Sequence, residues 1–290
     1  MKHKILIYGA GIIGSIYAVQ FSNAGYDVSV YARGERLQAL REKGLLYREG
    51  NLVRKADVTI LHTVDPQEVF DFIFVTVRYE QIEAALAELS GNQNRNIVTM
   101  VNNPKGYLKW EEILSKGRLI PAFPGAGGKI ADDILEYALT PKILQATTSG
   151  EVNGTITDRL RVLARLFQSS QVPHSISKNM DAWQKSHLAL VIPLANGIYY
   201  DGGNIDTTAR NKEVIRLMGT DLKKSFKALK TKGIPITPPK LNIFCYCPLW
   251  LMKLFLKIFC KTKLAATVSS HVPFIKEEMI LLEAGFWEIE

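Results

Sequence analysis

The stretch K-I-L-I-Y-G-A-G-I-I-G, residues 4–14, decides the fold of this chain. A short apolar run ends in the pattern G-x-G-x-x-G and an apolar-periodic segment follows, so the sequence predicts a strand, a tight turn and a helix. Gly9 allows the sharp turn, Gly11 leaves room for a pyrophosphate beside the backbone, and Gly14 lets the helix pack close to the strand. The start of the helix offers N–H groups and a positive dipole end to phosphates. We therefore predict a dinucleotide-binding loop made of Gly9, Ala10, Gly11, Ile12, Ile13 and Gly14, with a glycine turn that holds no ligand as the alternative.

Composition limits the class of protein. The 290 residues are 47% hydrophobic, which is enough for two domains that each have a core. Charged residues make up 22% and aromatic residues 9%, as in a folded globular protein. The net charge of +8 favours anionic ligands such as phosphates and carboxylates. Nucleic acid is not expected as a partner, because the basic residues are scattered and no nucleic-acid reader motif is present.

The cysteines and the N-terminus bear on the compartment. The chain has an odd number of cysteines, Cys245, Cys247 and Cys260, with no C-x-x-C pair and no nearby pair of histidines. This pattern argues against a disulfide framework and against a zinc site, so no metal is expected. The apolar run at the N-terminus is shorter than that of a signal peptide. We therefore expect a cytoplasmic protein with reduced thiols.

The end of the second predicted strand, residues 26–31, indicates which dinucleotide binds. An NAD-dependent enzyme usually has an acidic residue there for the ribose 2′-hydroxyl, whereas this chain has Arg33. A guanidinium binds a 2′-phosphate with two hydrogen bonds, so the sequence favours NADP. Arg78, at the end of the β-prone run 70–77, is a second candidate for the phosphate. Arg33 as a solvated loop charge is the alternative, and Glu35 keeps NAD as a minor option.

Further segments complete an N-terminal α/β Rossmann domain at residues 1–175. Strands are predicted at 96–101 and 118–123, and Asn103 follows the first of them beside a proline. Turn chemistry alone could explain the asparagine. The glycine-rich segment 124–128 is expected to bend the chain at the same edge of the sheet, either beside a flat cofactor ring or as a plain connector.

Residues 176–290 have helical patterns and no convincing strands, so they are expected to form an all-α domain. A helix is predicted from Asp181, a plausible N-cap, to residue 199, with a kink at Pro193. The very apolar segment 247–261 carries interspersed lysines and is too short to span a bilayer. A buried helix or a dimer contact is favoured for it over contact with a membrane surface. A homodimer is therefore left open, and no stable membrane span is expected.

The chain resembles the ketopantoate reductase (2-dehydropantoate 2-reductase) family, of the 6-phosphogluconate dehydrogenase-like superfamily, over nearly its whole length. Besides the glycine pattern, the motifs that carry the resemblance are Tyr31-Ala32-Arg33, Val75-Thr76-Val77-Arg78, Asn102-Asn103-Pro104-Lys105-Gly106, Trp183-Gln184-Lys185 and Val268-Ser269-Ser270. Arg78 stands where the family usually has lysine, and Pro104 replaces a glycine.

The resemblance implies an oxidoreductase that uses NADPH to reduce a small 2-oxo acid, as in pantothenate biosynthesis. It implies that Lys185 is the general acid and that Asn103 contacts the substrate or holds the nicotinamide. It also points to Ser270 and Glu278 as substrate contacts, with Glu283 as a second candidate glutamate.

Two departures separate this chain from the family pattern. Ala189 and Pro193 occupy positions where the family has asparagines on the helix that carries the lysine. Asn196 is about three turns away from Lys185 and is a poor substitute. The substrate is therefore left open between ketopantoate and a related acid. An opine- or imine-type NADP-dependent dehydrogenase and a non-catalytic NADP-binding sensor are the alternatives.

Overall fold

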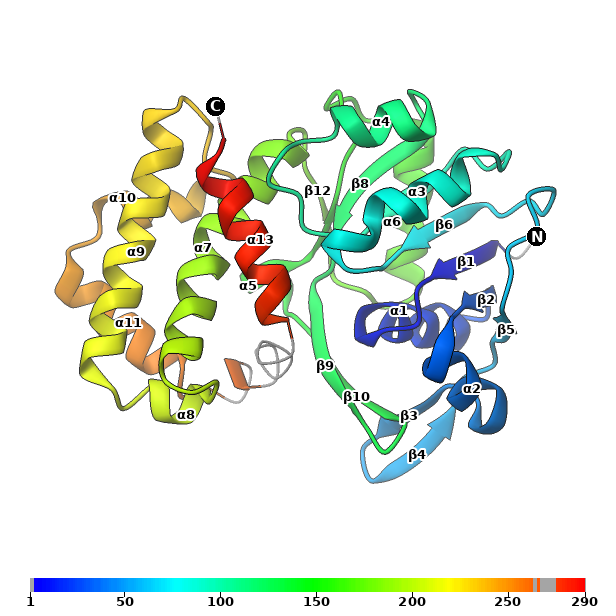
Figure 1. Cartoon of the computed structure of the whole chain (residues 1–290), viewed down its shortest axis with the longest axis horizontal. Helices are drawn as coiled ribbons and strands as arrows, with labels where there is room; N and C mark the ends of the chain where they lie inside the picture. The colour runs from blue at the N-terminus through cyan, green and yellow to red at the C-terminus, as the bar shows by residue number, and fades with distance from the viewer. Residues whose placement is uncertain (1–2, 263–264, 267–274, 290) are drawn as a thin grey trace. The chain divides into compact units, whose positions relative to one another are not determined.

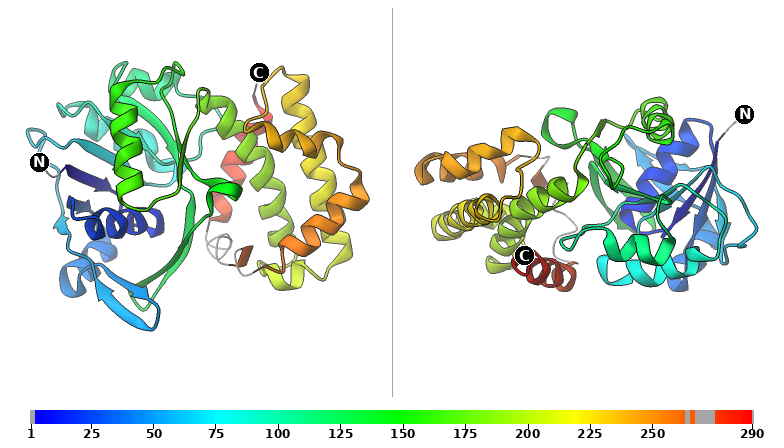
Figure 2. Two further views of the ribbon diagram at one scale, coloured as in Figure 1. Left: turned by 180° about the vertical axis from the view of Figure 1, so that it is seen from behind. Right: turned by 90° about the horizontal axis from the view of Figure 1, so that it is seen from above.

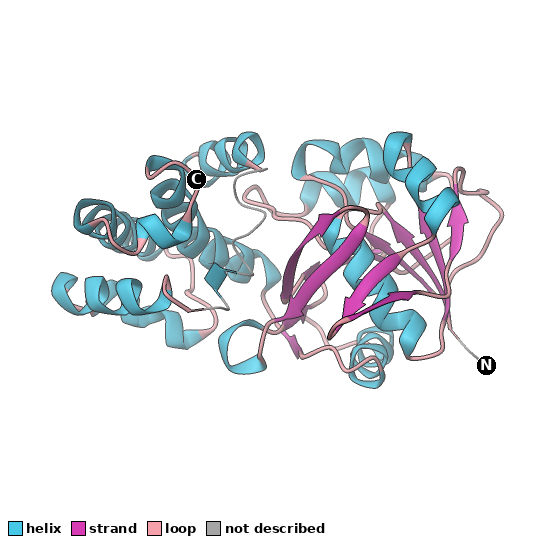
Figure 3. Ribbon diagram, turned by 90° about the horizontal axis from the view of Figure 1, so that it is seen from below, coloured by secondary structure: helices cyan, strands magenta, loops and turns pink. Residues whose placement is uncertain are grey.

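The computed structural model describes residues 3–262, 265–266 and 275–289, and these form two compact units. The first unit is Met1–Val101 with Tyr107–Met180, and the second is Asn102–Gly106 with Asp181–Glu290. The short segment 102–106 thus belongs to the second unit although it lies within the first in sequence. Among the described residues, strands occur in the first unit alone (Figure 3). The predicted fold class, an α/β Rossmann domain followed by helices, is confirmed.

The first unit contains two sheets and the helices that cover them, labelled in Figure 1. Its strands are β1 (Lys4–Tyr8), β2 (Asp27–Tyr31), β3 (Leu46–Glu49), β4 (Leu52–Lys55), β5 (Thr59–Leu61), β6 (Phe72–Val75), β7 (Ile97–Thr99), β8 (Leu119–Phe123), β9 (Ala126–Ala131), β10 (Ile134–Leu139), β11 (Thr147–Ser149) and β12 (His174–Ile176). Its helices are α1 (Ile12–Asn23), α2 (Gly34–Lys43), the 3₁₀ turn Tyr79–Gln81, α3 (Ile82–Ser90), α4 (Leu108–Leu114), α5 (Lys142–Gln145) and α6 (Asp158–Ser169).

The main sheet has the order β12-β11-β8-β7-β6-β1-β2-β5. The strands from β8 to β5 run parallel, and β11 is antiparallel to β8. The chain first forms β1 and β2 on one side and then crosses to β6 on the other, so the strand order reverses at β1. Ligands of open α/β sheets bind at the carboxyl ends of strands beside such a reversal. The residues that follow β1, β2 and β6 therefore lie at the edge where a dinucleotide is expected.

The predicted turn signals are present where the helices end and begin. Gly25 follows α1 with a φ of +82°, a conformation that glycine adopts without strain. The Thr157 side chain caps α6 by accepting a hydrogen bond from the N–H of Leu160. The β-prone runs form central strands whose side chains are almost all buried, as in β6.

A four-stranded sheet with the order β4-β3-β10-β9 packs on the outer side of α1. Figure 2 shows β9 and β10 as a long hairpin, coloured green, which reaches the β3–β4 hairpin, coloured blue. One apolar cluster joins both sheets to α1 and α6, with Tyr17, Phe21 and Phe167 fully buried at its centre. This core fixes α1, and with it the glycine loop that precedes the helix.

The bend expected at residues 124–128, beside a cofactor ring or as a plain connector, is shorter in the structure. Only Pro124 and Gly125 lie between the strands, because β9 begins at Ala126. A Cβ on Gly128 would lie 2.3 Å from the carbonyl oxygen of Glu136, and one on Gly125 would lie 2.4 Å from the backbone nitrogen of Thr147. These glycines thus permit close strand packing.

The second unit is helical. Its elements are α7 (Met180–Tyr200), the short α8 (Ile205–Thr208), α9 (Lys212–Thr231), the 3₁₀ turn Pro239–Asn242, α10 (Ile243–Tyr246), α11 (Leu249–Phe259) and α13 (Lys276–Trp287). Helix α7 contains Pro193 as expected. Asp181 is not the N-cap, because the helix already begins at Met180. No helix among the described residues is long and apolar enough to cross a membrane.

Candidate functional site

The glycine loop after β1 is held by the two neighbouring strands. Gly9 has a φ of +114°, which other residues rarely adopt, and its N–H donates a hydrogen bond of 3.1 Å to the carbonyl oxygen of Tyr31. The Thr76 hydroxyl donates to the Gly9 carbonyl oxygen over 2.8 Å. Tyr31 ends β2 and Thr76 follows β6, so both strands that flank β1 fix the turn.

The other two glycines have different surroundings. A Cβ on Gly14 would lie 1.9 Å from the Gly9 carbonyl oxygen and 2.5 Å from the Thr76 hydroxyl oxygen, so this position must be glycine for the helix to pack. A Cβ on Gly11 would have no neighbour within 4 Å. No side chain caps α1 at Gly11, so the first N–H groups of the helix are available to a ligand. An open backbone surface beside a helix start fits a pyrophosphate.

Arg33, the predicted contact of the 2′-phosphate, follows β2 and is more than half exposed. Its Nη1 atom lies 3.3 Å from a carboxylate oxygen of Glu88 on α3. The Tyr8 hydroxyl donates to the other oxygen of Glu88, and burial together with this carboxylate raises the pKa of Tyr8. An exposed ion pair of this length contributes little to stability, so Arg33 can exchange Glu88 for a phosphate.

Arg78 is also more than half exposed, after β6, with Nη1 4.0 Å from a carboxylate oxygen of Glu80. The two arginines thus follow the two strands beside β1. Arg36, which was not predicted from the sequence, contacts the glycine loop directly. Its Nε donates to the Ala10 carbonyl oxygen over 3.0 Å, and its Nη2 donates to the Ser15 hydroxyl over 3.3 Å. Burial lowers the pKa of Arg36. Its position one turn after Arg33 on α2 was the signal that could have revealed it.

In the second unit, Lys185 lies on the first turns of α7. Its Nζ donates to a carboxylate oxygen of Asp181 over 2.7 Å, and its side chain is only 13% exposed. The acidic residue precedes the lysine by four positions and lies near the helix N-terminus, which is the favourable order for such a pair. The arrangement holds the ammonium group in one place. The sequence reasoning singled out Asp181 but gave it the wrong role.

The loop 102–106 packs against this pair. A Cβ on Gly106 would lie 3.2 Å from the second carboxylate oxygen of Asp181, which is a tight contact, and the φ of +80° at Gly106 also favours glycine. Asn103 is 1% exposed: its Nδ2 donates to the Gly106 carbonyl oxygen over 2.6 Å, and its Oδ1 accepts from the N–H of Lys105 over 3.0 Å. Asn103 therefore shapes the loop that borders the ion pair. The Oδ1 atom of Asn102 is buried without a hydrogen-bond partner among the described residues.

Helix α13 holds the same loop from another side. A Cβ on Gly285 would lie 2.7 Å from the ring of Pro104, and Lys105 pairs with Glu288 over 3.0 Å. The proline that departs from the family pattern is thus matched by a glycine on the facing helix. Loop 102–106, α7 and α13 together form what we call the lysine cluster, defined by Asn103, Gly106, Asp181, Lys185 and Gly285.

The remaining predicted residues lie further along the helices. Ala189 is fully buried, and Asn196 donates to Glu283 over 3.0 Å, which ties α7 to α13. Glu278 is half-buried. Burial of Tyr199, and to a lesser extent the charge of Glu278, raise the pKa of Tyr199 to about 12. Ser270 lies outside the described residues.

Comparison with known proteins bears on the first unit most directly. Residues 5–128 match the family described as Ketopantoate reductase PanE/ApbA. The 2-dehydropantoate 2-reductase of Archaeoglobus fulgidus is 35% identical over 113 residues, which are 39% of this chain and 35% of the relative. The resemblance to the ketopantoate reductase family is confirmed over this segment. The match spans about a third of the length of the curated relative.

Two solved structures extend the likeness of fold to the whole chain. A dimeric ketopantoate reductase from Staphylococcus aureus has a TM-score of 0.62 at 14% identity and covers 98% of both chains. D-mandelate dehydrogenase, in a ternary structure with NADH and anilino(oxo)acetate, has a TM-score of 0.68 at 14% identity and covers 98% of this chain and 99% of its own. The two-unit fold of this chain is therefore one that dehydrogenases and reductases share.

Proposed function

We propose that this chain is an NADPH-dependent reductase that converts a small 2-oxo acid to the 2-hydroxy acid. The observation that carries the proposal is the lysine cluster. The largely buried ammonium group of Lys185 is held by the Asp181 carboxylate and borders a loop that the buried Asn103 shapes. The family match of residues 5–128 and the open glycine loop support a nicotinamide dinucleotide as the cofactor.

The proposed roles follow from the geometry of each unit. The cofactor, when bound, supplies the hydride. Its pyrophosphate is held by the backbone of residues 9–14, while Arg33 and Arg78 bind the 2′-phosphate. Arg33 does this by releasing Glu88. Because Glu88 competes with a 2′-phosphate for Arg33, it is the residue that would favour NADH over NADPH.

Lys185 is the proposed general acid. As negative charge develops on the carbonyl oxygen, the ammonium group stabilises it and then donates a proton from Nζ. Asp181 holds Nζ in place and Asn103 keeps the neighbouring loop in shape. We propose Glu278 and Ser270 as contacts of the substrate, in a domain that begins near residue 176.

The substituent of the 2-oxo acid is the less defined part of the substrate. Ketopantoate is the first candidate because the matched relatives are 2-dehydropantoate 2-reductases. A bulkier apolar 2-oxo acid is the second candidate, because Ala189, one turn after Lys185, stands where the ketopantoate reductase pattern has a polar asparagine. The likeness to a mandelate dehydrogenase fold is compatible with this second class.

The test is the oxidation of NADPH, followed by its near-ultraviolet absorbance, with a panel of 2-oxo acids that includes ketopantoate and phenylglyoxylate. Lys185→Ala should lower kcat by about 10²–10⁴-fold, the usual worth of a general acid, without changing NADPH affinity. The matched control is Lys227→Ala, which removes an exposed lysine from α9 of the same unit. Tight NADPH binding without turnover of any acid would favour the sensor alternative, and turnover only with an added amine would favour an opine- or imine-type dehydrogenase.

A further inference from the structure

The positive charge of this chain is concentrated in one segment. Residues 222–276 contain eleven lysines and no acidic residue. The whole chain has 36 basic and 28 acidic residues, so outside this segment 25 basic residues face 28 acidic ones, a net charge of −3. The described part of the segment includes the end of α9, all of α10 and all of α11. The rest of the chain is nearly balanced in charge, so the excess of lysines in this segment favours an anionic partner at this place.

Helix α11 lies in the middle of this segment and leaves a broad apolar face exposed. Met252 and Leu256 are buried, and α11 packs on α9. On the opposite face Trp250, Leu254 and Ile258, four residues apart, are 65%, 49% and 60% exposed. Leu251 and Phe255 extend this face and are also exposed. The sequence expectation of a buried helix thus holds for one face only.

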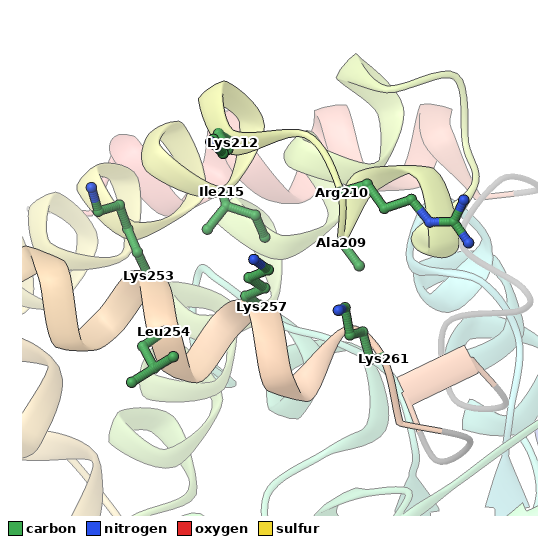
Figure 4. Close-up of a pocket in the computed structure, with 8 residues that line it drawn as sticks. All are labelled: Ala209, Arg210, Lys212, Ile215, Lys253, Leu254, Lys257 and Lys261. Atoms are coloured by element: carbon green, nitrogen blue, oxygen red, sulfur yellow. The ribbon is translucent and has the colours of Figure 1, made fainter.

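Three lysines border the apolar face. Lys253, Lys257 and Lys261 also repeat every four residues, so they form a row directly beside the row of Trp250, Leu254 and Ile258. Within the part of the chain that the structure describes, none of the three is in an ion pair. They line an open groove of about 380 Å³ with Arg210 and Lys212 from the start of α9. Figure 4 shows Lys257 and Lys261 directed into this groove, which Leu254 also lines.

We propose that α11 docks on the surface of an anionic phospholipid bilayer. The apolar face enters the boundary between headgroups and acyl chains, and the lysine row with Arg210 and Lys212 contacts the lipid phosphates. Tryptophan, phenylalanine and leucine on one face with lysines at its border are the composition of helices that lie in a membrane interface. With 11 residues the helix is about 16 Å long, so it lies in the plane of the surface and does not cross it.

A second copy of the chain is a less favoured partner for the exposed face of α11 than anionic lipid. A two-fold contact places the same patch on both partners, so the lysine rows would face each other without a compensating acid in the segment. Anionic lipid supplies the missing negative charge, and its attraction decreases as salt screens it. This proposal does not depend on the proposed reductase activity.

The test is flotation of the full-length protein with vesicles of phosphatidylcholine alone and with phosphatidylglycerol added. We expect binding to the anionic vesicles, little binding to the neutral ones, and release by high salt. Two variants should abolish it: Leu254→Glu with Ile258→Glu, and Lys253→Gln with Lys257→Gln and Lys261→Gln. Matched controls are Leu108→Glu, an exposed leucine on α4, and the triple change of Lys116, Lys142 and Lys178 to Gln, exposed lysines of the first unit. Both controls should bind as the unaltered chain does.

Tryptophan emission gives a second measurement. Trp250 on α11 is the most exposed of the four tryptophans. Anionic vesicles should therefore shift its emission to the blue, and Trp250→Phe should remove the shift. The proposal is overturned if anionic vesicles do not bind the protein, or if the α11 variants bind as well as the controls. A concentration-dependent dimer that Ile258→Glu dissociates, without vesicle binding, would assign the face to a second copy instead.

Discussion

The glycine loop of the first unit and the lysine cluster of the second differ in how they are built. The loop is a continuous stretch, residues 9–14, whose turn is fixed by Tyr31 and Thr76 at the ends of neighbouring strands. The cluster joins three segments that are far apart in sequence: loop 102–106, the start of α7 and the end of α13. A site within one continuous motif can be recognised from its pattern, whereas a site assembled by packing shows only its most distinctive residue. The predictions below test this difference, starting with the largest expected effect.

Within the loop, Gly11 and Gly14 should respond differently to the same change. The Cβ of Gly11→Ala meets no protein atom, but in the proposed binding mode it would meet the pyrophosphate, so NADPH affinity should fall by about 3 kcal/mol, roughly 100-fold, as one or two charged hydrogen bonds are lost. Its unfolding midpoint should not change. Gly14→Ala should lower both affinity and stability because the added Cβ collides with Gly9 and Thr76. Binding by fluorescence titration and thermal unfolding measure the two effects. Equal stability losses in both variants would contradict this account.

The arginine at the end of β2 tests cofactor choice. Arg33→Ser should weaken NADPH binding by about 2 kcal/mol, the worth of a charged hydrogen bond, and leave NADH binding unchanged. Glu88→Gln should raise the affinity for NADPH relative to that for NADH, because Glu88 competes with the 2′-phosphate for Arg33. Titration of both variants with both dinucleotides decides the point. Parallel loss of NADH and NADPH affinity in Arg33→Ser would show a structural role for the arginine.

In the lysine cluster, the contact between α13 and loop 102–106 can be broken and restored. Gly285→Ala places a Cβ against the ring of Pro104 and should lower stability by about 1–3 kcal/mol, as overpacking does, together with kcat. Adding Pro104→Gly should recover part of both, because the ring is removed. Urea unfolding and turnover are measured for the unaltered chain, the two single variants and the double variant. These values give the coupling free energy between Gly285 and Pro104. Additive effects would mean that the contact does not position the loop.

The smallest effect, taken per pH unit, concerns His187, which stacks on Trp183 two residues from Lys185. Burial lowers the pKa of His187 to about 3, so the native state stays neutral while the unfolded state gains a proton below about 6.5. Between these values the unfolded state binds more protons, and stability falls as the pH falls, by at most about 1.4 kcal/mol per unit. His187→Phe should therefore show a weaker decrease from pH 6.5 to 4 than the unaltered chain. Identical slopes in urea unfolding would contradict the buried neutral histidine.

Much of the first unit could be predicted from the sequence because its strands are short apolar runs bounded by turn residues. The order of β1, β2 and β6 follows from the glycine motif and its Rossmann context. The bend at 124–128 is shorter than the glycine pattern indicated, because a strand packed against a carbonyl needs glycine for the same reason that a loop does. Arg36 was missed because its contacts depend on how α2 meets the loop.

In the second unit, the sequence indicated Lys185 but not its surroundings. The pairing of Asp181 with Lys185 follows helical spacing and was within reach. The contacts of Gly106 with Asp181 and of Pro104 with Gly285 were not, because helix packing brings these residues together across 75 and 181 positions of sequence. The sequence left open whether the segment 247–261 is a buried helix, a dimer contact or a membrane-surface helix, since an apolar run does not show which of its faces is covered.

In the proposed reaction, the glycine loop and the lysine cluster serve one hydride transfer. The most direct measurement uses NADPH carrying deuterium at C4 of the nicotinamide, incubated with the 2-oxo acid that the panel selects, followed by mass spectrometry of the product. The account predicts a 2-hydroxy acid with one deuterium on C2, formed by the unaltered chain and hardly at all by Lys185→Ala. A protein that binds the labelled NADPH and leaves every acid without deuterium would contradict it.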